Sequence, residues 1–210
     1  MSKQFIWHFK INTAGPVWLP EGAASDSLDP RWELRFFWPE TATITLNGLD
    51  EHFLELSHYK IKYREDRYYL LPTEPYNLKS RHHELFYKPI LTKQHGAIAF
   101  GKKINLQQHN PNGPLPGAPH ETAQTLIQRI QTEGQAIAVT KEALVHTFTT
   151  IPTVKLELAR LRLNNIFYFS ICLESQHLDH ITLMAEHMLL PHSPTDYVSF
   201  LRKKTKETQP

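Results

Sequence analysis

Residues 31–38 read RWELRFFW, and charged and apolar side chains alternate along them. The charges are Arg31, Glu33 and Arg35, whereas positions 32, 34, 36 and 38 are all apolar. Successive side chains of an extended chain point to opposite faces, so this stretch predicts a β-strand with one polar and one apolar face. Pro39 cannot donate to a β-ladder and is expected to end the strand. The apolar face is expected to contact outer helices.

Other parts of the chain carry the same kind of signal. The stretch 58–71 predicts an extended segment with a turn or bulge at Glu65–Asp66, and Asn164–Asn165 fits a hairpin turn because Asn tolerates positive φ. The further strands are expected at 4–11, 78–80, 84–90, 97–100, 104–106, 135–141, 154–163 and 166–174. Helices are expected at 121–133, 178–190 and 197–201, and loops at 13–30 and 109–120. This pattern predicts a β-rich α+β fold, an antiparallel sheet or barrel with helices packed outside.

The bulk composition narrows the class of protein. The chain has 210 residues, a formal net charge of +2 and one cysteine, Cys172, so its fold needs no internal disulfide. No stretch approaches the roughly 20 apolar residues that span a bilayer, and the first residues lack the long apolar run of a signal peptide. We therefore expect a cytoplasmic protein with no membrane partner.

Basic residues are concentrated in one part of the chain. Between Lys60 and Lys103 there are ten Lys or Arg and only four acids. Alternate residues of a strand share a face, so Lys60, Lys62 and Arg64 form one basic row and Lys79 and Arg81 another. The complete set of candidate phosphate ligands is Lys60, Lys62, Lys79, Arg81, Lys88, Lys141, Arg160 and Arg162.

The direction in which these rows point decides their function. A barrel that turns them inward forms a positive cavity, in which the attraction to a phosphate-rich anion is strengthened by the low dielectric. Rows that face water are the ordinary arrangement of an antiparallel sheet. Such an outward basic face, combined with aromatic side chains, could bind RNA or single-stranded DNA. Cations buried in such a cavity would need counter-charges, which acids can supply. The acids Glu33, Glu157 and Glu174 could also hold Mg²⁺ or Mn²⁺ through their oxygens.

The order of several short motifs resembles the CYTH superfamily of triphosphate tunnel enzymes. The motifs are residues 32–37 (WELRFF), 66–72 (DRYYLLP), 77–81 (NLKSR), 84–88 (ELFYK), 155–158 (KLEL) and 168–174 (YFSICLE), followed by an expected helix and the segment 197–201. The resemblance spans residues 31–201. It implies an antiparallel eight-stranded barrel that forms a tunnel, with helices outside, and an activity on triphosphates that uses Mg²⁺ or Mn²⁺.

This chain departs from the family pattern in the first strand. The family signature is Glu-x-Glu-x-Lys, whose carboxylates bind the metal, but residues 31–35 begin with Arg31 in place of the first Glu. If residues 4–8 form that strand instead, both Glu are missing. A member that binds the anion without turnover is therefore an alternative to a metal-dependent triphosphatase.

The sequence thus predicts three regions and one main function. Residues 1–30 form an N-terminal strand and loop extension, residues 31–201 the barrel domain, and residues 202–210 a basic tail expected to be frayed. The predicted function is binding of tri- or polyphosphate, or of a nucleoside triphosphate, in a basic tunnel, with hydrolysis if a divalent metal binds. The alternatives are a non-catalytic interaction module and an RNA- or single-stranded-DNA-binding protein.

Overall fold

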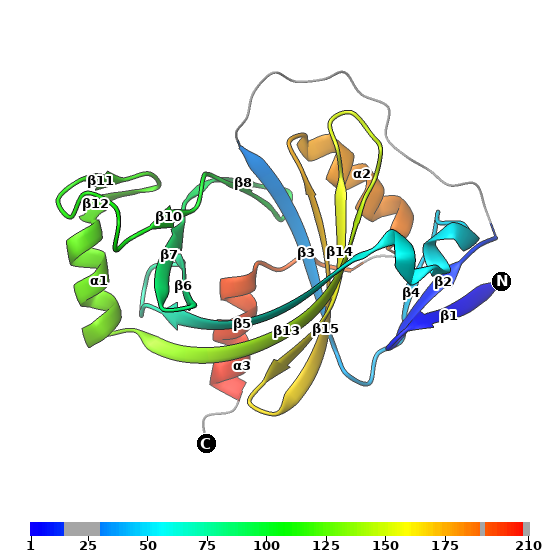
Figure 1. Cartoon of the computed structure of the whole chain (residues 1–210), viewed down its shortest axis with the longest axis horizontal. Coiled ribbons are helices and arrows are strands. Elements are labelled where there is room, and N and C mark those ends of the chain that lie inside the picture. Colours follow the sequence, from blue (N-terminus) through cyan, green and yellow to red (C-terminus); the bar gives the residue numbers. More distant parts are fainter. Residues whose placement is uncertain (15–29, 190–191, 208–210) are drawn as a thin grey trace.

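The computed structural model describes residues 1–14, 30–189 and 192–207. Most of its strands belong to one curled antiparallel sheet of ten strands (Figure 1). In spatial order these are β10 (Ile104–Asn105), β7 (Glu84–Lys88), β6 (Asn77–Arg81), β5 (Lys60–Leu70), β13 (Gln135–Thr147), β14 (Lys155–Leu163), β15 (Ile166–Ser175), β3 (Arg31–Pro39), β9 (Ala97–Phe100) and β8 (Ile90–Gln94).

The sheet curls like a half-barrel but does not close, so the expectation of a closed eight-stranded barrel is wrong. Within the described chain, β10 and β8 are the two ends of the sheet and do not pair with each other. The chain itself links the two ends, because Pro89 alone separates β7 from β8. Proline lacks the N–H that a continued ladder would need at this point.

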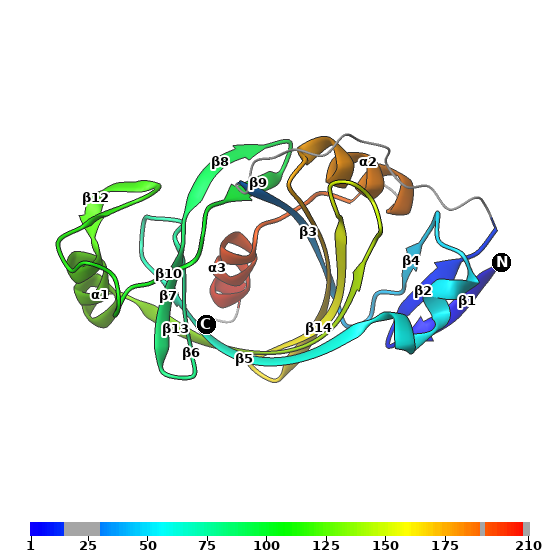
Figure 2. The same ribbon diagram turned by 45° about the horizontal axis from the view of Figure 1, so that its top comes forward.

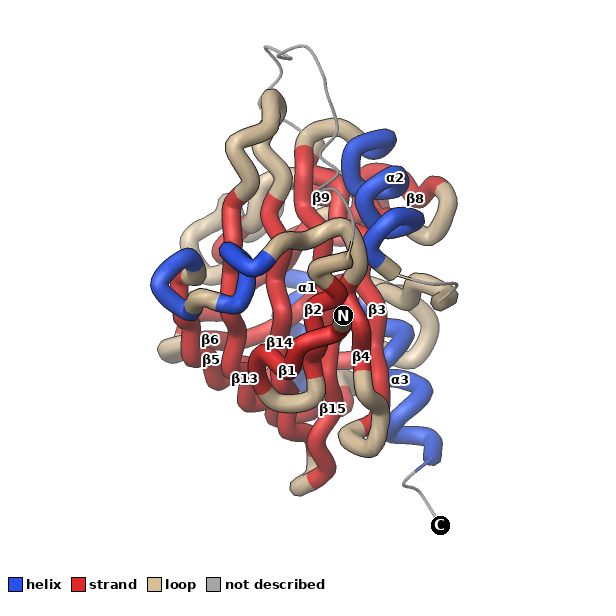
Figure 3. Tube along the Cα trace, turned by 90° about the vertical axis from the view of Figure 1, so that its right-hand side faces the viewer, coloured by secondary structure: helices blue, strands red, loops and turns tan. Residues whose placement is uncertain are grey.

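The convex face of the sheet is covered by the largest hydrophobic cluster. A small sheet of β1 (Ser2–Ile6), β2 (Phe9–Asn12) and β4 (Ile44–Leu46) lies over this face, together with helix α2 (Leu178–Met188) (Figure 3). The even-numbered side chains of β3 enter this cluster, as their alternation predicts. Phe9 and Ile11 are completely buried in it. Residues Glu51–Leu54 and Leu56–His58 form two short 3₁₀ turns.

Helix α3 (Tyr197–Glu207) lies on the concave side, inside the curl (Figure 2). Tyr197, Val198, Phe200 and Leu201 pack there against inward-facing side chains of β5, β13, β14 and β15. The guanidinium of Arg202 donates to the carbonyl oxygens of residues 71, 72 and 74 at 2.5, 2.8 and 2.6 Å. These contacts explain why the chain stays helical to Glu207, where the sequence suggested a frayed tail from Arg202.

Helix α1 (Ala123–Thr132) packs beside β6 and β7, where it buries Leu126 and Ile130 against Leu78 and Tyr87. Thr122 caps its first turn by accepting a hydrogen bond from the Thr125 amide. The preceding segment was expected to be a loop throughout, but it contains a short hairpin of β11 (Pro114–Leu115) and β12 (Ala118–Thr122).

The hairpin predicted at Asn164–Asn165 is confirmed, and a second hairpin joins β6 to β7. Asn164 and Asn165 have φ of 48° and 63° between β14 and β15, and His82 and His83 have φ of 50° and 67° between β6 and β7. The turn or bulge expected at Glu65–Asp66 is absent, because β5 runs from Lys60 to Leu70 in unbroken register with β13. No helix in the described part of the chain is long and apolar enough to cross a bilayer.

Candidate anion-binding site

The concave face holds a cavity of about 370 Å³ that begins where the apolar packing of α3 stops. Basic side chains from seven different segments line it, together with four carboxylates and several aromatic rings. The cations are Arg31, Arg35, Lys62, Arg64, Lys79, Arg81, Lys88, Lys103, Lys141 and Lys155, and the carboxylates are Glu33, Glu157, Glu174 and Asp196.

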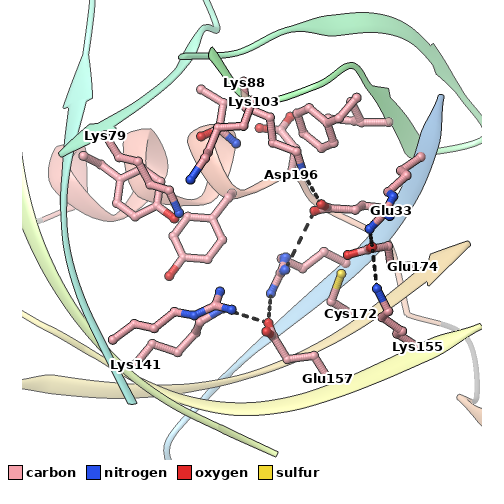
Figure 4. A pocket seen from close by; sticks show the side chains of 18 of the residues that line it. Glu33, Lys79, Lys88, Lys103, Lys141, Lys155, Glu157, Cys172, Glu174 and Asp196 are labelled. Carbon is pink, nitrogen blue, oxygen red and sulfur yellow. Dashed lines mark hydrogen bonds and ion pairs between the residues drawn. The ribbon is translucent and has the colours of Figure 1, made fainter. Parts of the chain in front are cut away.

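Strand alternation explains why so many charges meet here. Each strand turns its odd- or even-numbered residues toward the curl, and on β5, β6, β13 and β14 the inward set includes the basic residues. Figure 4 shows Lys79, Lys88 and Lys141 directed from different strands into the same space. Of the predicted phosphate ligands, the structure brings Lys62, Lys79, Arg81, Lys88 and Lys141 together.

Three predicted ligands do not line the cavity. Arg160 and Arg162 stand at even positions of β14, whose inward residues are Lys155 and Glu157, so both point to the outer side. Arg160 instead lies over the ring of Phe167 at 3.8 Å from its centroid. Lys60 begins β5 and is exposed to solvent.

The exposed outer face of the sheet carries charges of both signs, unlike the predominantly basic concave face. Its exposed part carries Arg67, Arg160 and Arg162, but Glu65 and Glu142 stand among them. The rest of this face lies under α2 and the small N-terminal sheet. The concentrated positive charge is therefore on the concave side.

Arg35 stands at the centre of a buried charge network on the cavity floor. Its Nη1 donates to Oε1 of Glu157 at 3.1 Å, and its Nη2 lies 3.9 Å from Oε2 of Glu33. Lys141 Nζ donates to the same Glu157 oxygen at 2.9 Å, and Lys88 bonds to Glu33. Burial raises the pKa of Glu157, but the charges of Lys141 and Arg35 lower it by more, so its pKa lies far below the usual range.

Two further carboxylates are also shared between cations. Asp66 is 7% exposed and accepts from Lys79 at 3.1 Å and from Arg81 at 2.6 and 2.7 Å. Glu174 bridges Arg31 at 3.0 Å and Lys155 at 3.4 Å. Burial works against the charge of Asp66, but the two bonded cations hold its pKa below the usual value.

The three carboxylates suggested as metal ligands do not form a metal site. Glu33, Glu157 and Glu174 each face Lys or Arg side chains. Among the residues that the structure describes, no three His, Cys, Asp or Glu side chains are grouped so that they could hold a metal ion. Mg²⁺ and Mn²⁺ need several converging oxygen ligands, and here the cationic side chains already occupy those oxygens.

Three cations of the cavity have no such counter-charge. In the described ranges, no carboxylate lies within ion-pair distance of Lys62, Arg64 or Lys103. Burial and the neighbouring Arg64 lower the pKa of Lys62, and Lys103 lies over the ring of Phe86 at 3.6 Å from its centroid. Like charges without counter-charges repel each other, more strongly where the dielectric is low, so these three cations favour a bound anion.

Burial also affects the paired lysines. It lowers the pKa of Lys79 to about 8, because the attraction of Asp66 does not offset burial and the nearby charges of Arg81 and Lys141. The pKa of Lys141 is lowered by burial as well, against the attraction of Glu157. Burial therefore disfavours the charged form of Lys79 and Lys141, and a bound anion would stabilise that form.

Aromatic rings form the inner end of the cavity. The rings of Tyr68 and Tyr197 stack with centroids 4.8 Å apart, and Arg35 lies 5.3 Å from the centroid of Tyr197. Cys172 lies beneath, 4% exposed, and burial raises the pKa of its thiol well above the usual value. A buried neutral thiol is unreactive, so Cys172 serves here as a packed side chain.

The predicted ligand set omitted several cavity residues that it could have included. Arg35, Arg64 and Lys155 each stand two positions from a predicted ligand on the same strand, and period two alone places them on the same face. Asp66 was missed because a turn was expected there. Lys103 follows the short strand β9 and carries no alternation signal.

Comparisons with known proteins include structural likenesses to solved proteins. The chain is similar to the crystal structure of a "putative adenylate cyclase" from Bacillus halodurans, with a TM-score of 0.39 and 8% sequence identity over 76% of this chain and 92% of the other. No protein-family model matches the sequence. No curated protein matches it either.

Proposed function

We propose that this protein is a divergent tunnel protein of CYTH type that binds a short phosphate-rich anion in the concave cavity without a bound metal. The supporting observation is the row of inward cations, of which Lys62, Arg64 and Lys103 have no carboxylate partner in the described chain. Guanidinium and ammonium groups match phosphate oxygens in charge and geometry.

A linear tri- or polyphosphate fits this arrangement better than a single phosphate. The unpaired cations come from β5 and from the segment after β9, so one compact ion cannot contact all of them as readily as an extended one. Glu33, Glu157 and Glu174 are each shared between two cations, and either cation could exchange one contact for a phosphate oxygen. The carboxylates reduce the repulsion between the cations of the cavity, but the cations outnumber them.

Metal-dependent hydrolysis has less support than binding. Arg35 lies between Glu33 and Glu157, where it bonds to oxygens that a metal would need. We therefore place the phosphate-rich anion among the cations alone and derive no metal-assisted step.

Isothermal titration with tripolyphosphate in EDTA tests this proposal. We expect one site with a micromolar dissociation constant, about 10-fold or more tighter than that of orthophosphate, because several charge-assisted contacts form together. Excess Mg²⁺ should weaken binding, since it neutralises part of the ligand. Absence of binding in EDTA contradicts the proposal. Binding that requires Mn²⁺ and is followed by phosphate release would indicate a metal-dependent hydrolase instead.

Tripolyphosphate affinity should fall as the pH rises through the pKa of Lys79, which burial lowers to about 8. Below that pH Lys79 is charged and attracts the anion. Above it the lysine is neutral, so binding requires proton uptake. Loss of this one charge weakens binding by at most about 10-fold between pH 7 and pH 9. The control is Lys79→Arg, whose guanidinium stays charged. Identical pH profiles for the two proteins would contradict a role for Lys79 in binding.

A further inference from the structure

Strand β5 has an open edge. It pairs with β13 along its whole length, from Lys60 to Leu70, but β6 pairs with it only at Arg67, Tyr68 and Tyr69. Among the described residues, no strand covers the other edge of Lys60–Asp66. Figure 1 shows β5 continuing well beyond the β6–β7 hairpin. The backbone groups on this edge are therefore available to another extended chain.

The surface is hollowed where a further strand would lie. Residues 61–65 form one side of this hollow, and Arg81 and His82 form its end. The positive φ values of His82 and His83 turn the chain back and stop β6 at that point. An added strand would thus continue the line of β6 along β5.

The side chains of the open edge present two different surfaces. Ile61 and Tyr63 point outward and are 70% and 61% exposed, which is unusual for large apolar side chains on a strand. Lys62 and Arg64 point to the cavity side and have no carboxylate partner in the described chain. The charges of Lys62 and Arg64 would repel the same basic strand of a second copy of this chain, and they would attract a strand that carries acidic side chains.

We propose that the Lys60–Asp66 edge of β5 binds an extended segment of a partner protein in which acidic and apolar residues alternate. The backbone of that segment would continue the β-ladder. Its acidic side chains would lie beside Lys62 and Arg64, and its apolar side chains beside Ile61 and Tyr63. Cross-strand neighbours stand about 5 Å apart, which allows both kinds of contact at once. This interaction does not require the proposed anion-binding function.

Fluorescence anisotropy with a labelled Asp-Val repeat peptide of about eight residues tests the backbone pairing. Alternate amides of an added strand point to β5, and the others point away. We therefore compare two isomers of the peptide, N-methylated at all Asp or at all Val residues. One isomer should lose at least 10-fold in affinity, while the other binds like the unmethylated peptide. Equal affinities of the two isomers would overturn the proposal.

A variant with Ile61→Asp and Tyr63→Asp tests the outer contacts. It should bind the peptide at least 10-fold more weakly but bind tripolyphosphate as before, because neither side chain lines the cavity. Leu183→Asp, on the exposed side of α2 at 40% exposure, is the matched control and should leave peptide binding unchanged. Unchanged peptide affinity in the double variant would also overturn the proposal. If tripolyphosphate does not bind the wild-type protein, that result contradicts the proposed anion site and leaves the proposed binding of a strand to β5 unaffected.

Discussion

Replacing Glu157 by Gln should lower the free energy of unfolding by about 3 kcal/mol, the cost expected when one partner of a buried ion pair is removed. Gln keeps the shape of the side chain but loses the charge that faces Arg35 at 3.1 Å and Lys141 at 2.9 Å. The two cations would then remain buried side by side without their common counter-ion. For a domain of this size we expect the melting temperature to fall by roughly 6–12 °C.

The control for this prediction is Glu142→Gln on the outer face of the sheet. Glu142 is exposed and stands opposite Arg160 in the ladder between β13 and β14. Exposed pairs contribute little, so its removal should change stability by less than about 0.5 kcal/mol. Tripolyphosphate should raise the melting temperature of the Glu157→Gln variant more than that of the wild type, because the ligand replaces the missing negative charge. A Glu157→Gln protein as stable as the wild type would show that the network on the cavity floor is not a structural requirement.

The double substitution Lys62→Ala and Arg64→Ala should weaken tripolyphosphate binding by about 100-fold or more. Both cations line the cavity and lack a carboxylate partner in the described part of the chain. A hydrogen bond to a charged group contributes about 1.5–3 kcal/mol, and the loss of two such contacts corresponds to this change in affinity. Stability should stay the same or rise slightly, since two repelling charges are removed.

Arg160→Ala combined with Arg162→Ala removes the same amount of charge from the outer side of β14. Titration calorimetry on both double variants separates a local effect of the cavity from an effect of net charge. The outward variant should bind with an affinity within about 2-fold of the wild type, because exposed charges are screened beyond about 10 Å. Equal losses in the two variants would contradict the inward site.

Alternation was sufficient to predict which face of each strand carries charge. It correctly separated Glu33 from Leu34 and Phe36, and it grouped Lys79 with Arg81. It was not applied to Arg160 and Arg162, which were included for their charge although their parity on β14 differs from that of Glu157. Arg160 and Arg162 stand at even positions of β14, whereas Glu157 stands at an odd one. Alternation along the strand therefore places both arginines on the face away from the cavity.

Pairing between distant strands could not be predicted in this way. Lys88 meets Glu33 across 55 residues, and Arg35 meets Glu157 across 122. These contacts depend on register and on the curl of the sheet, which no local pattern encodes. The acids suggested as metal ligands could be located in the sequence, but the cations that pair with them could not, for the same reason. The position of α3 inside the curl was equally hidden, because an amphipathic pattern does not say which face of a sheet a helix covers.

The position of α3 has a consequence for how a ligand enters the cavity. Because Tyr197 and the residues after it pack against the sheet beyond the charged cavity, the passage is blind at that end. A phosphate chain that binds as we propose would therefore enter from the opposite end or through the open side of the sheet, and it would not pass along the whole curl.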